Sequence, residues 1–102
     1  MSTFSDNVRK IVTAIPYGKV MSYGQVAALA GNPRSSRVVG WVMHANDDYR
    51  KLPCYRVVFK DGSLPEGYVF GGAEVQRNLL AAEGVTFTPD GKVDLALHSA
   101  IS

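Results

Sequence analysis

The chain has one cysteine, two histidines and no long apolar run, and each of these shortages excludes a class of protein. A single cysteine, Cys54, cannot form an internal disulfide or a zinc site made of several cysteines. His44 and His98 are not spaced as a metal pair with a carboxylate or with Cys54, so we expect no metal and no cofactor. The apolar runs stay well below the roughly 18 residues of a membrane span, and residues 1–10 lack the pattern of a signal peptide. We therefore expect a cytoplasmic protein without a membrane partner.

The length and composition fit one small globular domain. Cores divide only in chains much longer than 102 residues, so we expect a single domain over residues 1–102. The hydrophobic fraction of 46% is ordinary for a globular protein and too high for a disordered one. A monomer is the expected state.

Charge is divided unevenly along the chain. Residues 1–60 carry nine cationic and three acidic side chains, a net charge of +6. Residues 61–102 carry two cationic and six acidic side chains, a net charge of −4. A basic part in a small domain is typical of a face that binds a polyanion such as nucleic acid. Chance clustering on a solvated surface is the alternative, and charge alone leaves both open.

Two short helices joined by a turn are predicted over about residues 22–45. Ser22 and Gln25 fit a capping box at the start of the first helix, and Gly31 suits the left-handed turn that would close it. The second helix, residues 33–45, would begin at an Asn-Pro pair and take the recognition position of a helix-turn-helix. A plain helical hairpin has the same pattern.

The rest of the chain is predicted to add helices and small β-wings. Apolar spacing predicts helices over residues 4–15 and 73–83. Residues 52–59 lead into a strand, and Asp-Gly pairs at 61–62 and 90–91 are hairpin turn signals. The expected fold class is mainly α with small β-wings, a winged-helix-like helix-turn-helix DNA-binding domain.

Cys54 is the candidate nucleophile. It follows Pro53 in a tight turn that would present its sulfur, and Arg56 would supply the positive field that a reactive thiolate needs. The plainer interpretation is a small hydrophobic core residue. In the same way Tyr55 would be a half-buried aromatic, Arg56 a surface ion-pair partner and Glu83 a solvated residue in the last turn of a helix.

Three aromatic or cationic residues belong to the predicted helix-turn-helix. Arg37 lies in the second turn of the recognition helix, where it would reach into a groove or the base stack. Tyr23 opens the preceding helix and would press against a backbone phosphate. Trp41 is expected to be a packing residue, in the core or half exposed.

Taken together, three segments resemble a known family. GKVMSYGQVAALAGNPRSSRVVGWVMHAN, LPCYRVV and GG…NLLAAEGV resemble the C-terminal DNA-binding domain of the O6-alkylguanine-DNA alkyltransferases, also called methylated-DNA–protein-cysteine methyltransferases. They resemble even more the short alkyltransferase-like proteins that consist of this domain alone. The resemblance covers roughly residues 4–88. It implies a DNA repair protein that binds duplex DNA containing O6-alkylguanine through the minor groove and flips the damaged base into a pocket.

The resemblance gives individual residues a role. Tyr23 would rotate the phosphate 3′ of the lesion, Arg37 would fill the vacated place in the stack, and Asn46 would brace the turn that carries the acceptor position, Cys54. Val57 and the loop of residues 63–72 would line the lesion pocket. The implied DNA- and lesion-binding set is Tyr23, Arg34, Ser35, Ser36, Arg37, Asn46, Cys54, Tyr55, Arg56, Val57, Val69 and Phe70.

The chain departs from the family pattern at two places. In the transferases a histidine, oriented by the glutamate that Glu83 matches, takes the cysteine proton through a water. Here Tyr55 stands in that place, and a tyrosine with a pKa of about 10 is a poor base at neutral pH. The alkyltransferase-like proteins usually have Trp or Ala where this chain has Cys54. In the loop, the family tyrosine and serine fall on Val69 and Phe70, so we expect an apolar lid and a roomier pocket.

Three functions remain open at this point. The first is a damage sensor that binds O6-alkylguanine without alkyl transfer and flags it for nucleotide excision repair proteins, associating with the nucleoid while bound to DNA. The second is a suicide alkyltransferase with Cys54 as acceptor. The third is a winged-helix DNA binder without lesion preference. The short chain and the missing histidine favour the first, and Cys54 favours the second. Glu83 is a catalytic candidate only in the second.

Overall fold

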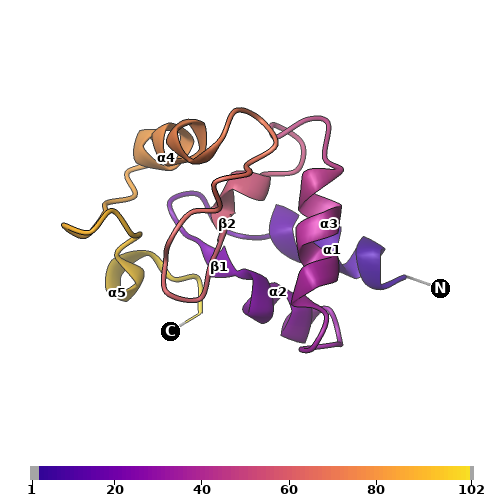
Figure 1. Ribbon diagram of the computed structural model, residues 1–102. Coiled ribbons are helices and arrows are strands. Elements are labelled where there is room, and N and C mark those ends of the chain that lie inside the picture. Colours follow the sequence, from indigo (N-terminus) through magenta and orange to yellow (C-terminus); the bar gives the residue numbers. More distant parts are fainter. Residues whose placement is uncertain (1–2, 102) are drawn as a thin grey trace.

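The computed structural model describes residues 3–101, which form a mainly helical fold with one small sheet. Figure 1 shows α1, α2 and α3 gathered on one side, α4 and α5 on the other, and the two strands between them. The fold class predicted from the sequence is confirmed. The elements are α1 (Phe4–Thr13), β1 (Met21–Ser22), α2 (Tyr23–Leu29), α3 (Ser36–His44), the 3₁₀ turn η1 (Cys54–Arg56), β2 (Val57–Val58), α4 (Ala73–Ala82) and α5 (Leu95–His98).

The main core lies where the first three helices pack together. Each helix contributes its apolar stripe, and Val8, Val12, Val26 and Val39 are fully buried there. Burying one such side chain contributes about 1.5–3 kcal/mol, so these few residues hold the three helices in place. A second, smaller cluster around Leu80 fixes α4 against the sheet.

The first helix of the predicted helix-turn-helix begins and ends as expected. Ser22 Oγ accepts a hydrogen bond from the backbone N–H of Gln25 (3.1 Å), and Gln25 Oε1 accepts one from the N–H of Ser22 (2.9 Å). This is the predicted capping box. Gly31 follows the helix with φ +108°, a backbone conformation that favours glycine.

The second helix begins later than predicted. The expectation was a helix over 33–45 with an Asn-Pro start, but α3 begins at Ser36. Asn32 Oδ1 accepts a hydrogen bond from the N–H of Arg34, and Asn32 O accepts one from Ser35. These local bonds make a turn of residues 32–35 in place of the first helical turn.

The small sheet is parallel and joins distant segments, so a small amount of β structure is present as expected but not in the expected hairpin form. Met21 pairs with Val57 and Ser22 with Val58, although the two strands stand far apart in the sequence. The turn at 61–62 returns the chain without adding a strand, and the second predicted hairpin is reduced to one antiparallel bridge, Phe87 with Val93. This pairing fixes the positions of two neighbouring elements. Because β1 leads directly into α2 and η1 leads directly into β2, the start of α2 and the turn η1 lie side by side.

Helices α1 and α4 follow the predictions closely, whereas the short helix α5 was not predicted. The first helix ends at Thr13 rather than 15, and α4 ends at Ala82, with Glu83 as its cap and Gly84 closing it at φ +87°. Within residues 3–101, none of the helices has the length and apolar character that crossing a membrane requires.

Candidate functional site

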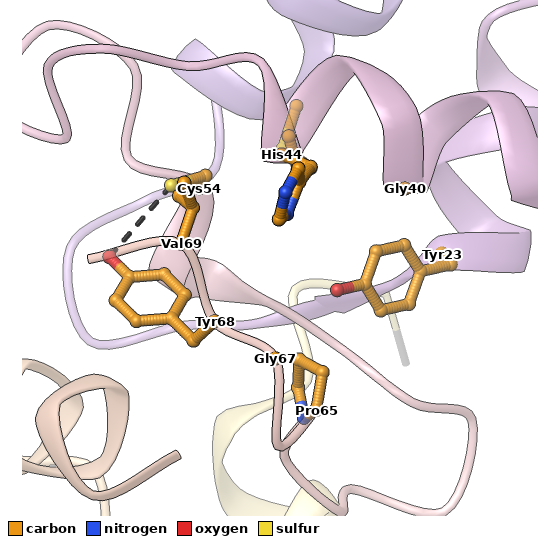
Figure 2. Close-up of a pocket in the computed structure, with 9 residues that line it drawn as sticks. Tyr23, Gly40, His44, Cys54, Pro65, Gly67, Tyr68 and Val69 are labelled. Atoms are coloured by element: carbon orange, nitrogen blue, oxygen red, sulfur yellow. Dashed lines mark hydrogen bonds between the residues drawn. The ribbon is translucent and has the colours of Figure 1, made fainter. Parts of the chain in front are cut away.

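A cavity of about 130 Å³ opens between α2, α3, η1 and the lid loop, by which we mean residues 63–72. Figure 2 shows Tyr68 turned toward the sulfur of Cys54, and Tyr23 and His44 pointing into the same space from the side of α2 and α3. The predicted acceptor position and the predicted phosphate-turning residue therefore share one cavity. The lining residues are Tyr23, Gly40, Met43, His44, Cys54, Pro65, Gly67, Tyr68 and Val69.

The thiol of Cys54 is held by hydrogen bonds rather than presented freely. Its side chain is only 3% exposed, so the expectation that the tight turn displays the sulfur is wrong. Asn46 Nδ2 donates to Sγ at 3.2 Å and to the carbonyl of Leu52 at 2.8 Å, which ties the turn to the end of α3. The thiol in turn donates to Tyr68 Oη at 3.8 Å. Burial raises the pKa of Cys54, and the hydrogen bonds that its side chain makes with Asn46 and Tyr68 offset this only in part.

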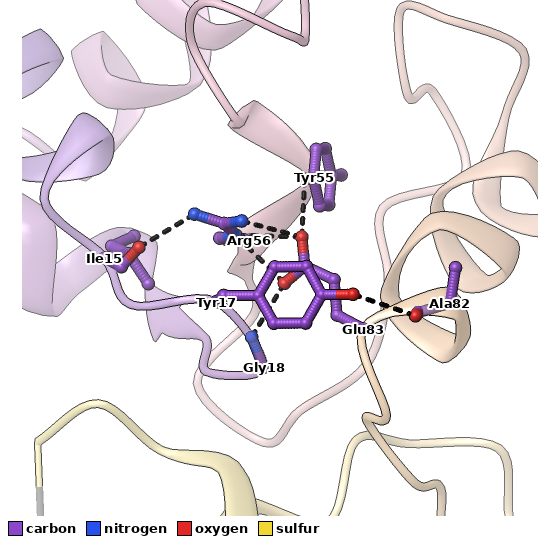
Figure 3. Close-up of polar contacts among 7 residues, drawn as sticks. All are labelled: Ile15, Tyr17, Gly18, Tyr55, Arg56, Ala82 and Glu83. Atoms are coloured by element: carbon purple, nitrogen blue, oxygen red, sulfur yellow. Dashed lines mark hydrogen bonds and ion pairs between the residues drawn. The ribbon is translucent and has the colours of Figure 1, made fainter.

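Glu83 is the centre of a buried polar network on the other side of η1 (Figure 3). Arg56 Nη2 and Nε donate to its carboxylate at 2.7 and 3.0 Å, and the N–H of Gly18 donates at 2.8 Å. Arg56 Nη1 donates to the carbonyl of Ile15 at 2.8 Å. The phenol of Tyr55 completes the set with a hydrogen bond to Oε2 of 2.5 Å.

This network overturns three expectations from the sequence. The Glu83 side chain is 4% exposed, so it is not a solvated end-of-helix residue. The Arg56 side chain is 13% exposed and is not a surface partner. Its charge is neutralised by Glu83, so it does not lend Cys54 the positive field that would activate a thiol.

The electrostatics of the network keep Tyr55 neutral. Burial by itself would raise the pKa of Glu83, but the hydrogen bonds from Arg56, Gly18 and Tyr55 hold it below its usual range. Burial, together with the hydrogen bond to the Glu83 carboxylate, raises the pKa of Tyr55 to about 12. At neutral pH Tyr55 is thus a hydrogen-bond donor to Glu83 and offers no basic group to Cys54.

The exposed side of α3 carries the predicted DNA-contacting residues. Arg37 and Ser36 are exposed on the first turns of the helix, Arg34 is exposed on the turn before it, and Ser35 is half-buried at its N-cap. Arg37 makes no hydrogen bond or ion pair with any residue among 3–101. Trp41 is 65% exposed, so the expectation of a packing residue is wrong.

The lid loop differs from the sequence prediction in detail. Val69 lines the cavity as predicted for the pocket wall. Phe70 does not, because its ring packs against Tyr49 and Tyr68 at centroid distances of 5.3 and 5.7 Å. Val57 is fully buried in the core and lies outside the cavity wall, because it pairs with β1.

Met43 and His44 line the cavity without having been predicted to, and Tyr68 was predicted only as part of the lid loop of residues 63–72. Tyr68 gives the lid the hydroxyl that an apolar lid would lack, so that expectation is corrected. Tyr68 directly precedes Val69, and both side chains line the cavity, whereas the ring of Phe70 packs against Tyr49 and Tyr68. Among residues 3–101, no three His, Cys, Asp or Glu side chains gather as a metal site requires.

The fold and the site define a helix-turn-helix domain in which a cysteine faces a cavity between the helices and a lid. The sequence model of the 6-O-methylguanine DNA methyltransferase DNA-binding domain matches residues 3–85. The chain belongs to this family.

Its relatives include both methyltransferases and a protein named for base flipping. The rat methylated-DNA–protein-cysteine methyltransferase is 42% identical over 76 residues, which is 74% of this chain and 36% of that enzyme. The chain therefore spans about a third of the length of this relative. The DNA base-flipping protein of Escherichia coli K12 is 41% identical over 93 residues, 91% of this chain and 70% of that protein.

Two solved structures extend the comparison to three dimensions. Atl1 of S. pombe, in complex with damaged DNA containing O6-carboxymethylguanine, superposes with a TM-score of 0.81 and 30% identity over 97% of both chains. Mycobacterium tuberculosis OGT in complex with DNA superposes with a TM-score of 0.74 and 37% identity over 82% of this chain and 50% of that one.

Proposed function

We propose that this protein binds O6-alkylguanine in duplex DNA, takes the flipped base into the cavity beside Cys54 and acts as a damage sensor without alkyl transfer. The likeness to Atl1 over 97% of both chains supports a damaged-DNA ligand. The relative named for base flipping supports an extruded base. In this proposal the lasting complex marks the lesion for nucleotide excision repair proteins.

The observation that carries the proposal is the set of partners around Cys54. Asn46 donates to the sulfur, Tyr68 is a neutral phenol, and Glu83 is occupied by Tyr55 and Arg56. An ordinary thiol is a few per cent thiolate at pH 7, and burial lowers that share here. A general base contributes about 10²–10⁴-fold to the rate of such a step. Without one, alkyl transfer should be very slow, while binding of the lesion does not depend on it.

The DNA-binding part of the proposal uses the residues around the cavity mouth. Flipping a base costs a few kcal/mol, and the cost is smaller for a damaged pair. The free guanidinium of Arg37 would occupy the vacated stack, and Tyr23, at the start of α2, would turn the adjoining phosphate. Exposed Arg34 and small Ser36 would let α3 approach the sugar-phosphate backbone closely.

Suicide transfer to Cys54 is the second candidate, because this side chain lines the cavity. In that reaction the sulfur forms the bond to the alkyl carbon, the guanine O6 leaves, and the thiol proton must pass to a base. Two expectations separate the candidates: a transferase methylates itself stoichiometrically, whereas a sensor stays unmodified while bound.

Single-turnover measurement on one O6-methylguanine duplex tests the proposal. The wild type, Cys54→Ala and Tyr55→His are each incubated with the duplex, and the protein is examined by mass spectrometry while binding is followed on labelled DNA. We expect wild type and Cys54→Ala to bind the lesion duplex more tightly than undamaged duplex, with no methyl group on Cys54. Rapid methylation of wild type, lost in Cys54→Ala, would make the protein a transferase. Equal affinity for both duplexes would make it a general DNA binder.

A further inference from the structure

The exposed face of α3 carries a large aromatic side chain that internal packing does not use. Trp41 is 65% exposed, while Val39, Val42 and Met43 of the same helix are buried. Arg37 stands one turn earlier at the i−4 position, so the two side chains share one face of the helix. The indole N–H of Trp41 has no hydrogen-bond partner among residues 3–101.

Trp41 lies in a shallow groove of about 460 Å³ that adjoins the cavity of Cys54. Phe59, 45% exposed, forms part of the same groove, and its ring contacts that of Tyr23 at a centroid distance of 5.6 Å. Three residues line both the groove and the cavity, so the two hollows lie next to each other at the start of α2 and the middle of α3. The lining residues are Tyr23, Ser36, Arg37, Gly40, Trp41, Phe59 and Pro65.

The chemistry of this groove matches nucleobases better than an acidic or purely apolar ligand. Its lining offers aromatic faces and one unpaired cation, and contains no carboxylate. Aromatic faces stack on bases of any identity, and apolar side chains enter the minor groove as wedges. The free indole N–H is a donor, and the minor groove presents acceptors on every base pair.

Gly40 gives a second, independent indication that another molecule comes close here. A Cβ built on Gly40 meets nothing within 4 Å, so internal packing does not require a glycine. Glycine inside a helix nevertheless costs about 1 kcal/mol relative to alanine. Gly40 lines both hollows, where close approach of a sugar-phosphate backbone gives a reason for the missing side chain.

We propose that Trp41 is a DNA-contacting residue that, with Phe59, forms an aromatic shelf against the bases and sugars flanking the flipped nucleotide. The inference rests on the proposed function, because it takes duplex DNA as the molecule seated on α3. The shelf adds a contact next to the Arg37 finger. In this arrangement the Arg37 guanidinium takes the place of the extruded base, and the shelf keeps the neighbouring base-pair step unstacked.

Because Trp41 is the only tryptophan of the chain, its fluorescence reports on the shelf directly. The full-length protein is titrated with O6-methylguanine duplex and with the matched undamaged duplex, while anisotropy of labelled DNA reports binding separately. We expect indole fluorescence to be quenched in step with lesion binding. Trp41→Ala should weaken lesion binding about tenfold or more, the effect of one lost base–aromatic contact, and Trp41→Phe should weaken it less.

Leu97→Ala is the matched control, because Leu97 is 59% exposed on α5, away from the groove; it should bind as wild type. Lesion binding with unchanged indole fluorescence and a fully active Trp41→Ala would overturn the shelf and leave the proposed function standing. Quenching by both duplexes with equal affinity would support the shelf and overturn the lesion preference. Binding of neither duplex would overturn both.

Discussion

The phenol of Tyr55 donates a hydrogen bond of 2.5 Å to Oε2 of Glu83. The same carboxylate accepts three hydrogen bonds from Arg56, so its acceptor capacity is taken up within the network and not offered to the cavity. Cys54 consequently sits among groups that neither take its proton nor stabilise its charge with a cation. The surroundings of Cys54 therefore favour the neutral thiol, although this cysteine stands at the acceptor position.

The reactivity of Cys54 toward a small alkylating reagent should show this directly. Burial raises its pKa, so the reactive thiolate appears only at higher pH than the ordinary value of about 9.0. We expect the rate of iodoacetamide modification to keep rising with pH beyond that value, and to be slower at pH 7 than in the chain unfolded in urea. A pH midpoint for Cys54 modification at or below the midpoint of the unfolded chain would contradict this expectation.

The ion pair of Glu83 should make stability depend on pH in one direction. Its pKa is depressed in the folded state, so the stability it contributes is present above the unfolded value of about 4.5 and is lost as pH falls through the folded value. Glu83→Gln should lower the free energy of unfolding by about 3 kcal/mol at pH 7, because it leaves Arg56 buried without its partner. Urea unfolding at pH 7 and at acidic pH measures both effects.

Glu74→Gln is the control for that series, since Glu74 is an exposed acid in the first turn of α4. It should change stability by well under 1 kcal/mol. If Glu83→Gln were as mild as Glu74→Gln at pH 7, the network around Arg56 would not be holding η1 to α4.

Gly40→Ala should raise stability and weaken DNA binding at the same time. The added methyl group has open space, and alanine favours the helix by about 1 kcal/mol. Gly31→Ala has equally open space but a φ of +108°, so it should lower stability instead. Thermal unfolding and anisotropy of labelled lesion duplex separate the two effects. Unimpaired binding by Gly40→Ala would show that DNA does not approach α3 closely there.

Arg37→Ala should fold normally and lose much of the preference for lesion DNA. The Arg37 side chain makes no hydrogen bond or ion pair within residues 3–101, whereas in the proposed function it fills the place of the flipped base. The slope of log affinity against log salt should fall by about 1 if the guanidinium also neutralises a phosphate. Arg9→Ala, which removes an exposed ion pair with Asp6 on α1, is the control and should keep both affinity and slope.

The parts of the fold set by neighbouring residues could be predicted from the sequence. Ser22 and Gln25 lie three residues apart, so their reciprocal caps are readable in the chain, and Gly31 marks the end of α2 for the same reason. The start of α3 was misplaced because Asn32 has two local options, a cap or a turn, whose energies are similar.

The contacts within the site join residues that are far apart in the sequence, and these contacts were predicted less well than the local ones. Arg56 and Glu83 meet only because α4 packs against η1, which no local pattern reveals. Trp41 was expected to be a packing residue, in the core or half exposed, because tryptophan is highly buried on average, and only the orientation of α3 shows its exposure. Cys54 and Tyr23 were candidates from their residue type and position in the chain, and the family pattern added Asn46 as the residue that would brace the turn carrying Cys54.

The pairing of Met21 with Val57 also bears on when the cavity comes into existence during folding. One strand carries the chain into Tyr23, and the other receives it from Cys54, so both walls are set by a contact between distant parts of the sequence. Such contacts form late, because the closure of the long intervening loop must precede them. We therefore expect the three helices to pack around their valines before the cavity, the proposed site of a flipped base, is complete.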